Sequence, residues 1–214
     1  MRPRARVKIC GITRIEDALA CAQAGVDAIG LVFYQPSPRN VSVEKAQEIV
    51  AALPPFVSVV GLFVNASASE LAGINAQVNL DMIQFHGDET PAFCASKSPK
   101  PWIKALAMQA DLEVEKTAGA YMQAGAQGIL LDAYVKGVRG GTGMAFDWAR
   151  FPKSQEIPYI LAGGLTPENV REAITQTRPW AVDLSSGVEL EHGIKSHQAI
   201  QKLVSQTYIG ATGV

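Results

Sequence analysis

A cysteine and an aspartate each end a short apolar run of the sequence, where a strand would stop. Cys10 closes the run Val7–Cys10, and Asp132 closes Ile129–Asp132. A thiolate can act as a base, and a carboxyl group whose burial favours the protonated form can act as a general acid. Ordinary roles compete with both: a lone cysteine is most often a small buried apolar residue, and an aspartate a solvated loop residue or helix cap. The residues alone leave these alternatives open.

The first strand alternates in polarity. Lys8 and Cys10 share one face, and Val7 and Ile9 share the other. The apolar face should meet helices, so Lys8 and Cys10 are expected to point inward, with Cys10 uppermost. As a base, Cys10 needs a lowered pKa, to which the Lys8 charge could contribute. Alternatively, Lys8 simply pairs with an interior carboxylate such as Asp183.

Two glycine-containing turns follow the last two predicted strands. They are Ala162–Leu165 and Ser185–Gly187. Glycine lets backbone amides approach an anion closely, and serine hydroxyls add donors, so the two turns together favour a phosphate site. A third glycine-rich segment, Gly137–Gly143, could close over a ligand, although an ordinary connection is the equal alternative.

Further polar residues follow the second and fourth predicted strands. Arg39 comes directly after a proline and could clamp a carboxylate in bidentate fashion, with a solvated surface arginine as the alternative. Gln84 and His86 close the fourth strand and would face the same cavity. His86 could instead be a hydrogen-bonded barrel residue.

Short β-branched runs alternate with amphipathic stretches, which predicts a parallel sheet. Eight such units in 214 residues favour a single (β/α)8 barrel over the alternative of an open doubly wound sheet. One domain is expected over 1–214, with a frayed tail at 208–214. The predicted strands are Arg6–Cys10, Ala28–Phe33, Val57–Val64, Met82–His86, Trp102–Leu106, Gly128–Asp132, Pro158–Ala162 and Ala181–Ser185. The predicted helices are Ile15–Ala24, Val43–Ala52, Ala68–Ala76, Pro91–Lys97, Leu112–Ala124, Pro167–Gln176 and Ser196–Ser205.

Capping residues support several of these helices. Thr13 with Glu16 predicts a capping box, and Thr166 predicts a cap ahead of a helix at Pro167. Gly25 and Gly125 stand where helices should stop.

Composition narrows the class of protein. Hydrophobic residues make up 48% of the chain and charged residues 18%, with a net charge of −1, so no global charge attracts nucleic acid or an anionic membrane. The three cysteines show no disulfide or zinc spacing. The basic N-terminus has no apolar signal core after it, and no apolar run reaches membrane-spanning length. A cytoplasmic protein without metal or cofactor is expected.

These segments resemble phosphoribosylanthranilate isomerase of tryptophan biosynthesis, over nearly the whole chain. Singly the glycine turns recur in many phosphate-binding barrels, but together and in this order the matching stretches are highly specific. They are Lys8–Thr13, Ser37–Arg39, Val60–Asn65, His86–Glu89, Leu131–Asp132, Arg139–Gly143, Phe146–Trp148, Leu161–Leu165 and Asp183–Glu189.

The resemblance implies an aldose–ketose isomerase that performs an Amadori rearrangement. It makes Asp132 the general acid and Cys10 the general base, and it sets Arg39 opposite the anthranilate carboxylate. A closed ring independently puts strand 1 three steps from strand 6, so the two side chains would flank one pocket from nearly opposite sides. The other expected substrate and phosphate contacts are His86, Gly141, Thr142, Gly143, Gly163, Gly164, Asp183, Ser185, Ser186 and Gly187.

Rival functions remain on the same fold. Indole-glycerol-phosphate synthase would need a lysine and carboxylate set that is not found here, and a metal-dependent pentose-phosphate epimerase would need more ligands than His86. A catalytically silent binding barrel is a third alternative, against which Cys10 and Asp132 speak. The chain departs from the family pattern modestly, at Phe85 and in the turn His192–Ser196. A monomer is expected, with a homodimer as the alternative.

Overall fold

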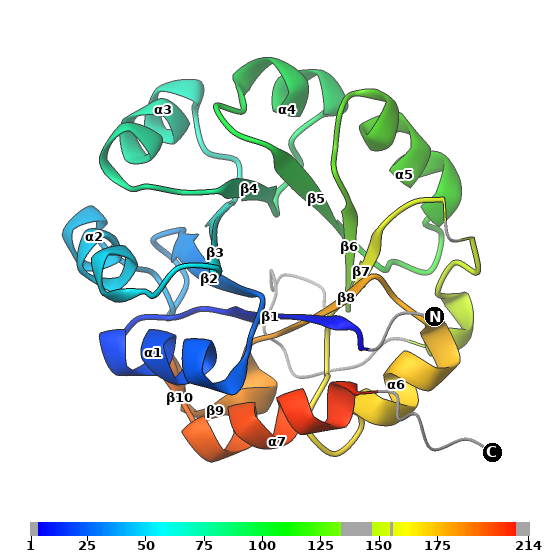
Figure 1. The fold of residues 1–214 in the computed structure, drawn as a ribbon. Helices are drawn as coiled ribbons and strands as arrows, with labels where there is room; N and C mark the ends of the chain where they lie inside the picture. The colour runs from blue at the N-terminus through cyan, green and yellow to red at the C-terminus, as the bar shows by residue number, and fades with distance from the viewer. Residues whose placement is uncertain (1–3, 134–146, 155, 209–214) are drawn as a thin grey trace.

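Eight parallel strands close into a barrel in which each strand pairs with its neighbours in sequence and β8 pairs with β1 (Figure 1). The structure is a computed structural model that describes residues 4–133, 147–154 and 156–208. The expected (β/α)8 barrel is confirmed. The strands are β1 (Arg6–Cys10), β2 (Ala28–Phe33), β3 (Ser58–Phe63), β4 (Met82–Phe85), β5 (Trp102–Ala107), β6 (Ile129–Asp132), β7 (Tyr159–Leu161) and β8 (Ala181–Leu184).

Helices form a ring outside these strands (Figure 1). A two-stranded antiparallel hairpin that was not predicted from the sequence lies between β8 and α7 along the chain. The remaining elements are α1 (Ile15–Ala24), α2 (Val43–Ala52), α3 (Ala68–Gln77), α4 (Pro91–Lys97), α5 (Val114–Gln123), η1 (Trp148–Arg150), α6 (Val170–Thr177), η2 (Ser186–Val188), β9 (Glu189–Glu191), β10 (Ile194–Lys195) and α7 (His197–Thr207).

The ends of α1 and the start of α6 test the predicted capping residues. Gly25 ends α1 in the left-handed conformation, as expected (φ 82°). Thr13 does not cap that helix, because its hydroxyl donates to the carbonyl of Gly193 at 2.5 Å. The Thr166 hydroxyl does accept from the Glu168 amide, but it does so in a turn that precedes α6, which begins at Val170 with Asn169 as its N-cap.

The described residues form three apolar clusters, of which the smallest contains Cys10, Val32 and Leu62. Residues such as Val7 and Ile9 face outward and pack in the large core between strands and helices. A smaller cluster inside the barrel includes Ile103, Leu130 and Ile160. Polar side chains such as Lys8, Gln84 and Asp183 are also buried, and they are described with the site below.

Tyr208, the first residue of the tail that was predicted to fray, is paired with the N-terminal segment. Tyr208 forms an antiparallel bridge with Arg4, whose guanidinium also lies 5.9 Å from the Tyr208 ring, so the chain is held at this residue. The rest of that tail, 209–214, and the Gly137–Gly143 segment lie outside the described residues. Among the helices of the described ranges, none combines the length and apolar character that crossing a membrane requires.

Candidate active site

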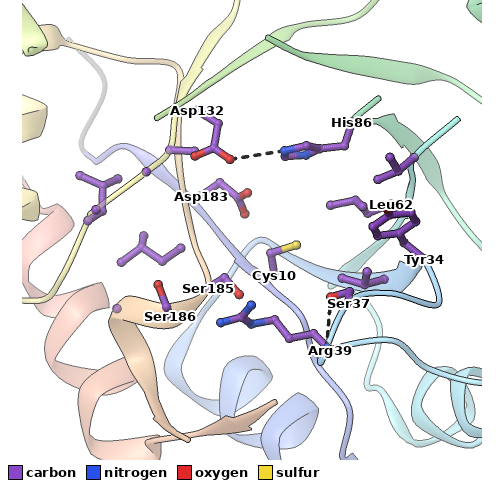
Figure 2. A pocket seen from close by; sticks show the side chains of 18 residues that line it. Cys10, Tyr34, Ser37, Arg39, Leu62, His86, Asp132, Asp183, Ser185 and Ser186 are labelled. Carbon is purple, nitrogen blue, oxygen red and sulfur yellow. Dashed lines mark hydrogen bonds and ion pairs between the residues drawn. The ribbon is translucent and has the colours of Figure 1, made fainter. Parts of the chain in front are cut away.

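A pocket opens at the carboxyl ends of the barrel strands, the end where the sequence predicted the chemistry (Figure 2). It encloses about 720 Å³ with its open mouth. Cys10 from β1 and Asp132 from β6 both line it, and β8 and β7 lie between these two strands in the closed order. The predicted acid–base pair therefore shares one cavity, as barrel geometry required.

Cys10 lies above a buried ion pair. Lys8 Nζ is 2.8 Å from Asp183 Oδ1 inside the barrel, which confirms the alternative pairing predicted for Lys8. Gly30 on β2 makes room for both groups, because a Cβ there would lie 2.8 Å from the thiol sulfur and 3.1 Å from Lys8 Nζ. Both short distances follow from inward-facing side chains on neighbouring strands.

The pKa of Cys10 shifts in the direction opposite to the one expected. Burial raises the pKa of the Cys10 thiol, and the Lys8 charge opposes only part of that rise. Burial disfavours the charge of Lys8, but Asp183 and Cys10 together raise the pKa of Lys8 overall. A cation therefore stays beside the thiol, ready to stabilise a thiolate when one forms.

Asp132 is a buried residue, so the solvated-loop alternative is wrong. Its Oδ1 accepts a hydrogen bond from the amide of Ala133 at 2.9 Å, and its Oδ2 lies 3.3 Å from His86 Nε2 (Figure 2). His86 lines the pocket, and its Nδ1 meets the Gln84 side chain at 2.9 Å. Gln84 is fully buried behind His86 and does not itself line the pocket, which corrects its predicted position.

The turns after β7 and β8 come together as a cradle on one side of the pocket. Gly163, Gly164, Ser185, Ser186 and Gly187 all line it. Gly163 has φ 80°, and a Cβ on Gly187 would overlap the carbonyl oxygen of Leu165. Only glycine fits at these close approaches, which leaves backbone amides exposed to an anion. The other expected phosphate contacts, Gly141, Thr142 and Gly143, lie outside the described residues.

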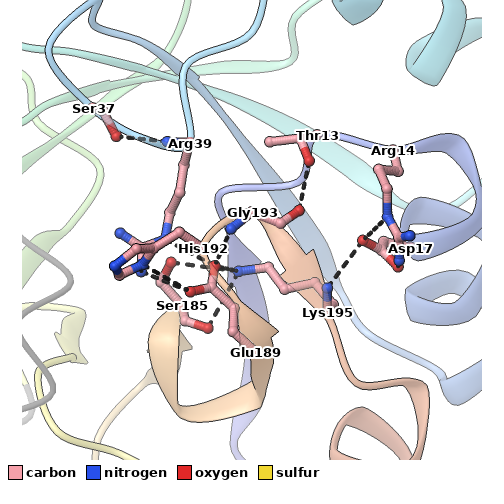
Figure 3. Close-up of polar contacts among 10 residues, drawn as sticks. All are labelled: Thr13, Arg14, Asp17, Ser37, Arg39, Ser185, Glu189, His192, Gly193 and Lys195. Atoms are coloured by element: carbon pink, nitrogen blue, oxygen red, sulfur yellow. Dashed lines mark hydrogen bonds and ion pairs between the residues drawn. The ribbon is translucent and has the colours of Figure 1, made fainter.

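Arg39 lines the pocket but is not a free carboxylate clamp. Its Nε and Nη2 donate to both oxygens of Glu189 at 2.8 and 2.7 Å, and Nη2 also lies 3.3 Å from His192 Nδ1 (Figure 3). Arg39 is 7% exposed, so the solvated-surface alternative is wrong. Among the described residues, these contacts use Nε and Nη2 and do not involve Nη1.

Glu189 links Arg39 to a second buried cation. Lys195 Nζ lies 2.7 Å from Glu189 Oε1 and also donates to the Ser185 carbonyl at 3.2 Å. Burial alone would raise the pKa of Glu189, but Arg39 and Lys195 lower it overall. One carboxylate between two cations leaves a net positive charge directly behind the phosphate cradle. Sequence reasoning missed Glu189 and Lys195, because the hairpin that carries them gave no strand signal.

An apolar wall faces the cradle from β2 and β3. Val32, Tyr34, Leu62 and Val64 line it, and Figure 2 shows Tyr34 and Leu62 on the side away from Ser185. These residues were also missed, although alternation along the two strands could have found them. The pocket is thus divided: an anion fits the cradle, an apolar ring fits the wall, and Cys10 and Asp132 lie between.

Comparison with known proteins gives one consistent result. Residues 7–206 match the family model described as N-(5'phosphoribosyl)anthranilate (PRA) isomerase. The N-(5'-phosphoribosyl)anthranilate isomerase of Pseudomonas fluorescens (strain Pf0-1) is 57% identical over 200 residues, which cover 94% of this chain and 97% of the relative. The enzyme of the same name from Alcanivorax borkumensis is 52% identical and covers 98% of both chains.

Solved structures agree with these relatives. The phosphoribosyl anthranilate isomerase of Thermotoga maritima superposes with a TM-score of 0.86 at 39% identity, covering 95% of this chain and 98% of that one. A structure of phosphoribosyl anthranilate isomerase in complex with reduced 1-(O-carboxyphenylamino)-1-deoxyribulose 5-phosphate superposes with a TM-score of 0.80 at 38% identity, over 95% of this chain and 98% of that one. A further structure shows monomers generated from the dimeric Thermotoga maritima isomerase. It is 36% identical to this chain, covers 95% of this chain and 98% of its own, and superposes with a TM-score of 0.82.

Proposed function

Since this chain belongs to the N-(5'-phosphoribosyl)anthranilate isomerase family, we propose that Asp132 and Cys10 are the acid and base of its reaction. The enzyme converts N-(5-phosphoribosyl)anthranilate to 1-(2-carboxyphenylamino)-1-deoxyribulose 5-phosphate in tryptophan biosynthesis. The observation that carries the assignment is the presence of both residues in one pocket, between a phosphate cradle and an apolar wall. Fluorescence loss from phosphoribosylanthranilate in the presence of the purified protein tests the activity.

The first step is ring opening. Asp132, in its protonated form, gives its proton to the furanose ring oxygen as the bond between that oxygen and C1′ breaks. The nitrogen lone pair forms the C1′=N bond, so the product is an iminium ion that keeps the N–H hydrogen and carries the positive charge. Asp132 is left as a carboxylate, which the amide of Ala133 and the neighbouring His86 stabilise.

The second step moves a proton. The Cys10 thiolate removes the C2′ proton, the C–H electrons form a C1′=C2′ bond, and the iminium C=N electrons return to nitrogen. The resulting enolamine becomes the ketone as C1′ gains a proton and the C2′ hydroxyl loses one. Lys8 supports this step, because its charge favours the thiolate over the thiol.

Binding follows the division of the pocket. The phosphate occupies the cradle of the β7 and β8 turns, where backbone amides and the positive charge from Arg39 and Lys195 favour an anion. The anthranilate ring lies against the apolar wall, and its carboxylate faces Nη1 of Arg39. Asp183, beneath both, faces the sugar.

Gly187→Ala is expected to weaken phosphate binding by roughly tenfold or more, because the added methyl group would overlap the Leu165 carbonyl and separate the two turns of the cradle. Titration with the reduced product and competition by inorganic phosphate measure the loss. Gly119→Ala is the matched control, since nothing lies near a Cβ at that position in α5 and the change should stabilise the helix. Equal affinity in the wild type and Gly187→Ala would contradict the cradle.

Lys8→Met is expected to move the ascending limb of the kcat–pH profile upward by about one unit. The base works when deprotonated, and the Lys8 charge lowers the pKa of Cys10, so its removal raises that pKa and lowers the rate at neutral pH. Asp183→Asn should move the limb the other way, because the Asp183 charge raises the Cys10 pKa. A shift in the same direction for both variants would argue against the thiolate base.

The enzyme is proposed to act in the cytoplasm as a monomer, without a metal or cofactor. A homodimer is the alternative, since the Thermotoga maritima relative is described as dimeric. Sedimentation equilibrium of the purified protein distinguishes the two states.

A further inference from the structure

Gln84 is a polar residue inside the barrel that the mechanism above does not use. It lies on β4 with an exposed fraction of zero, one alternation step below His86. Its partner on β5 is the apolar Ile103, which packs with Leu130 inside the barrel. An aliphatic side chain would therefore suit the position of Gln84. A buried amide here calls for a reason beyond packing.

The contact between Gln84 and His86 has a defined direction. Gln84 Nε2 lies 2.9 Å from His86 Nδ1, and an amide nitrogen only donates. Nδ1 must therefore accept, which leaves the ring proton of neutral His86 on Nε2. Gln84 thereby selects one of the two imidazole tautomers.

The selected tautomer presents its N–H to Asp132. His86 Nε2 lies 3.3 Å from Asp132 Oδ2, while Asp132 Oδ1 is already engaged by the amide of Ala133 (Figure 2). With Oδ1 held in this way, Oδ2 is the oxygen that carries and releases the acidic proton. The imidazole N–H then stands ready to stabilise the carboxylate that remains.

The oxygen of the Gln84 amide indicates that this residue is not there for stability alone. Within the described ranges, Gln84 Oε1 is buried and has no hydrogen-bond partner. Burying an oxygen in this way costs stability, and an apolar residue of similar size would avoid the cost. The chain keeps the amide in spite of that cost, and its polar contact within the part of the chain that the structure describes is the one with His86.

We propose that Gln84 is a positioning residue that holds His86 in the Nε2–H tautomer, so that the imidazole stabilises ionised Asp132. The inference rests on the proposed role of Asp132 as the acid. Gln84 itself touches neither substrate nor the reacting atoms and acts through His86. This role concerns the ring-opening step alone and leaves the role of Cys10 unchanged.

Two variants of the full chain test the proposal. Gln84→Met removes the donor at similar size, and Gln84→Glu replaces it with an acceptor that draws the proton to Nδ1. The tautomer is read from the ¹⁵N shifts of the His86 ring, assigned by their loss in His86→Asn. Gln47→Met on α2 is the matched control, because that glutamine is exposed and bonds only a surface carbonyl.

Wild-type His86 should show a protonated Nε2 and a bare Nδ1, and Gln84→Glu should show a protonated Nδ1. Both variants should lower kcat by roughly tenfold to a hundredfold while affinity for the reduced product stays unchanged. Gln84→Met should also melt no lower than the wild type, since the unpartnered oxygen is gone. A protonated Nδ1 in the wild type, or an unchanged kcat in folded Gln84→Met, overturns the proposal. Should Gln84→Met fail to fold, the wild-type and Gln84→Glu spectra still decide.

Failure of this inference is distinguishable from failure of the proposed function. If Asp132→Asn is inactive while Gln84→Met keeps full kcat, the acid assignment stands and the Gln84 role is wrong. If Asp132→Asn is fully active, the acid assignment itself is wrong.

Discussion

Cys10→Ala is expected to lower kcat by roughly 10²–10⁴-fold or more while the barrel remains folded, the usual scale for a positioned base. The substitution removes the group that takes the C2′ proton but leaves the cradle and the apolar wall intact. Affinity for the reduced product should therefore survive. Steady-state kinetics and a binding titration together separate lost chemistry from lost binding.

Cys21→Ala and Cys94→Ala are the controls for this effect. Both cysteines are buried in helices outside the pocket, and burial raises the pKa of each thiol to about 12. These changes should cost stability through small cavities and leave kcat at the wild-type level. A Cys10→Ala enzyme with near-wild-type kcat would remove Cys10 from the mechanism.

Asp132→Asn is expected to lower kcat on the same scale, roughly 10²–10⁴-fold or more. The amide keeps the size of the carboxyl group, and its oxygen can still accept from the Ala133 amide, so the loop after β6 keeps its hydrogen bond. The variant nevertheless has no acidic proton for the ring oxygen. Ring opening should become the slow step, which pre-steady-state kinetics can resolve.

Asp81→Asn provides a comparison at the far end of the barrel. Asp81 accepts from the Val59 amide just before β4, remote from the pocket, so its change should affect melting temperature rather than turnover. Wild-type turnover in Asp132→Asn would contradict the acid assignment.

Alternation of residue types was enough to predict the barrel. The bounds predicted for β1, β2, α1, α2 and α4 agree with the structure residue for residue, because apolar periodicity and strong stop signals such as Gly25 coincide there. Position at a strand end was likewise enough to bring Cys10, Asp132 and the two glycine turns to one pocket.

Features that depend on contacts between distant segments could not be predicted in this way. Thr13 has the right spacing for a cap but bonds Gly193 instead, across 180 residues. The engagement of Arg39 by Glu189 likewise joins the loop after β2 to strand β9, 150 residues further along the chain. The pKa direction of Cys10 depends on how far burial outweighs the Lys8 charge, which spacing along one strand does not reveal.

One assay that follows the fluorescence of phosphoribosylanthranilate with the wild type, Cys10→Ala and Asp132→Asn side by side tests the acid–base assignment. We expect rapid loss of fluorescence with the wild type, with formation of the carboxyphenylamino-deoxyribulose phosphate, and a much slower loss with each variant. A wild-type rate no faster than buffer, or a rate above about a tenth of wild type in either variant, would contradict the assignment.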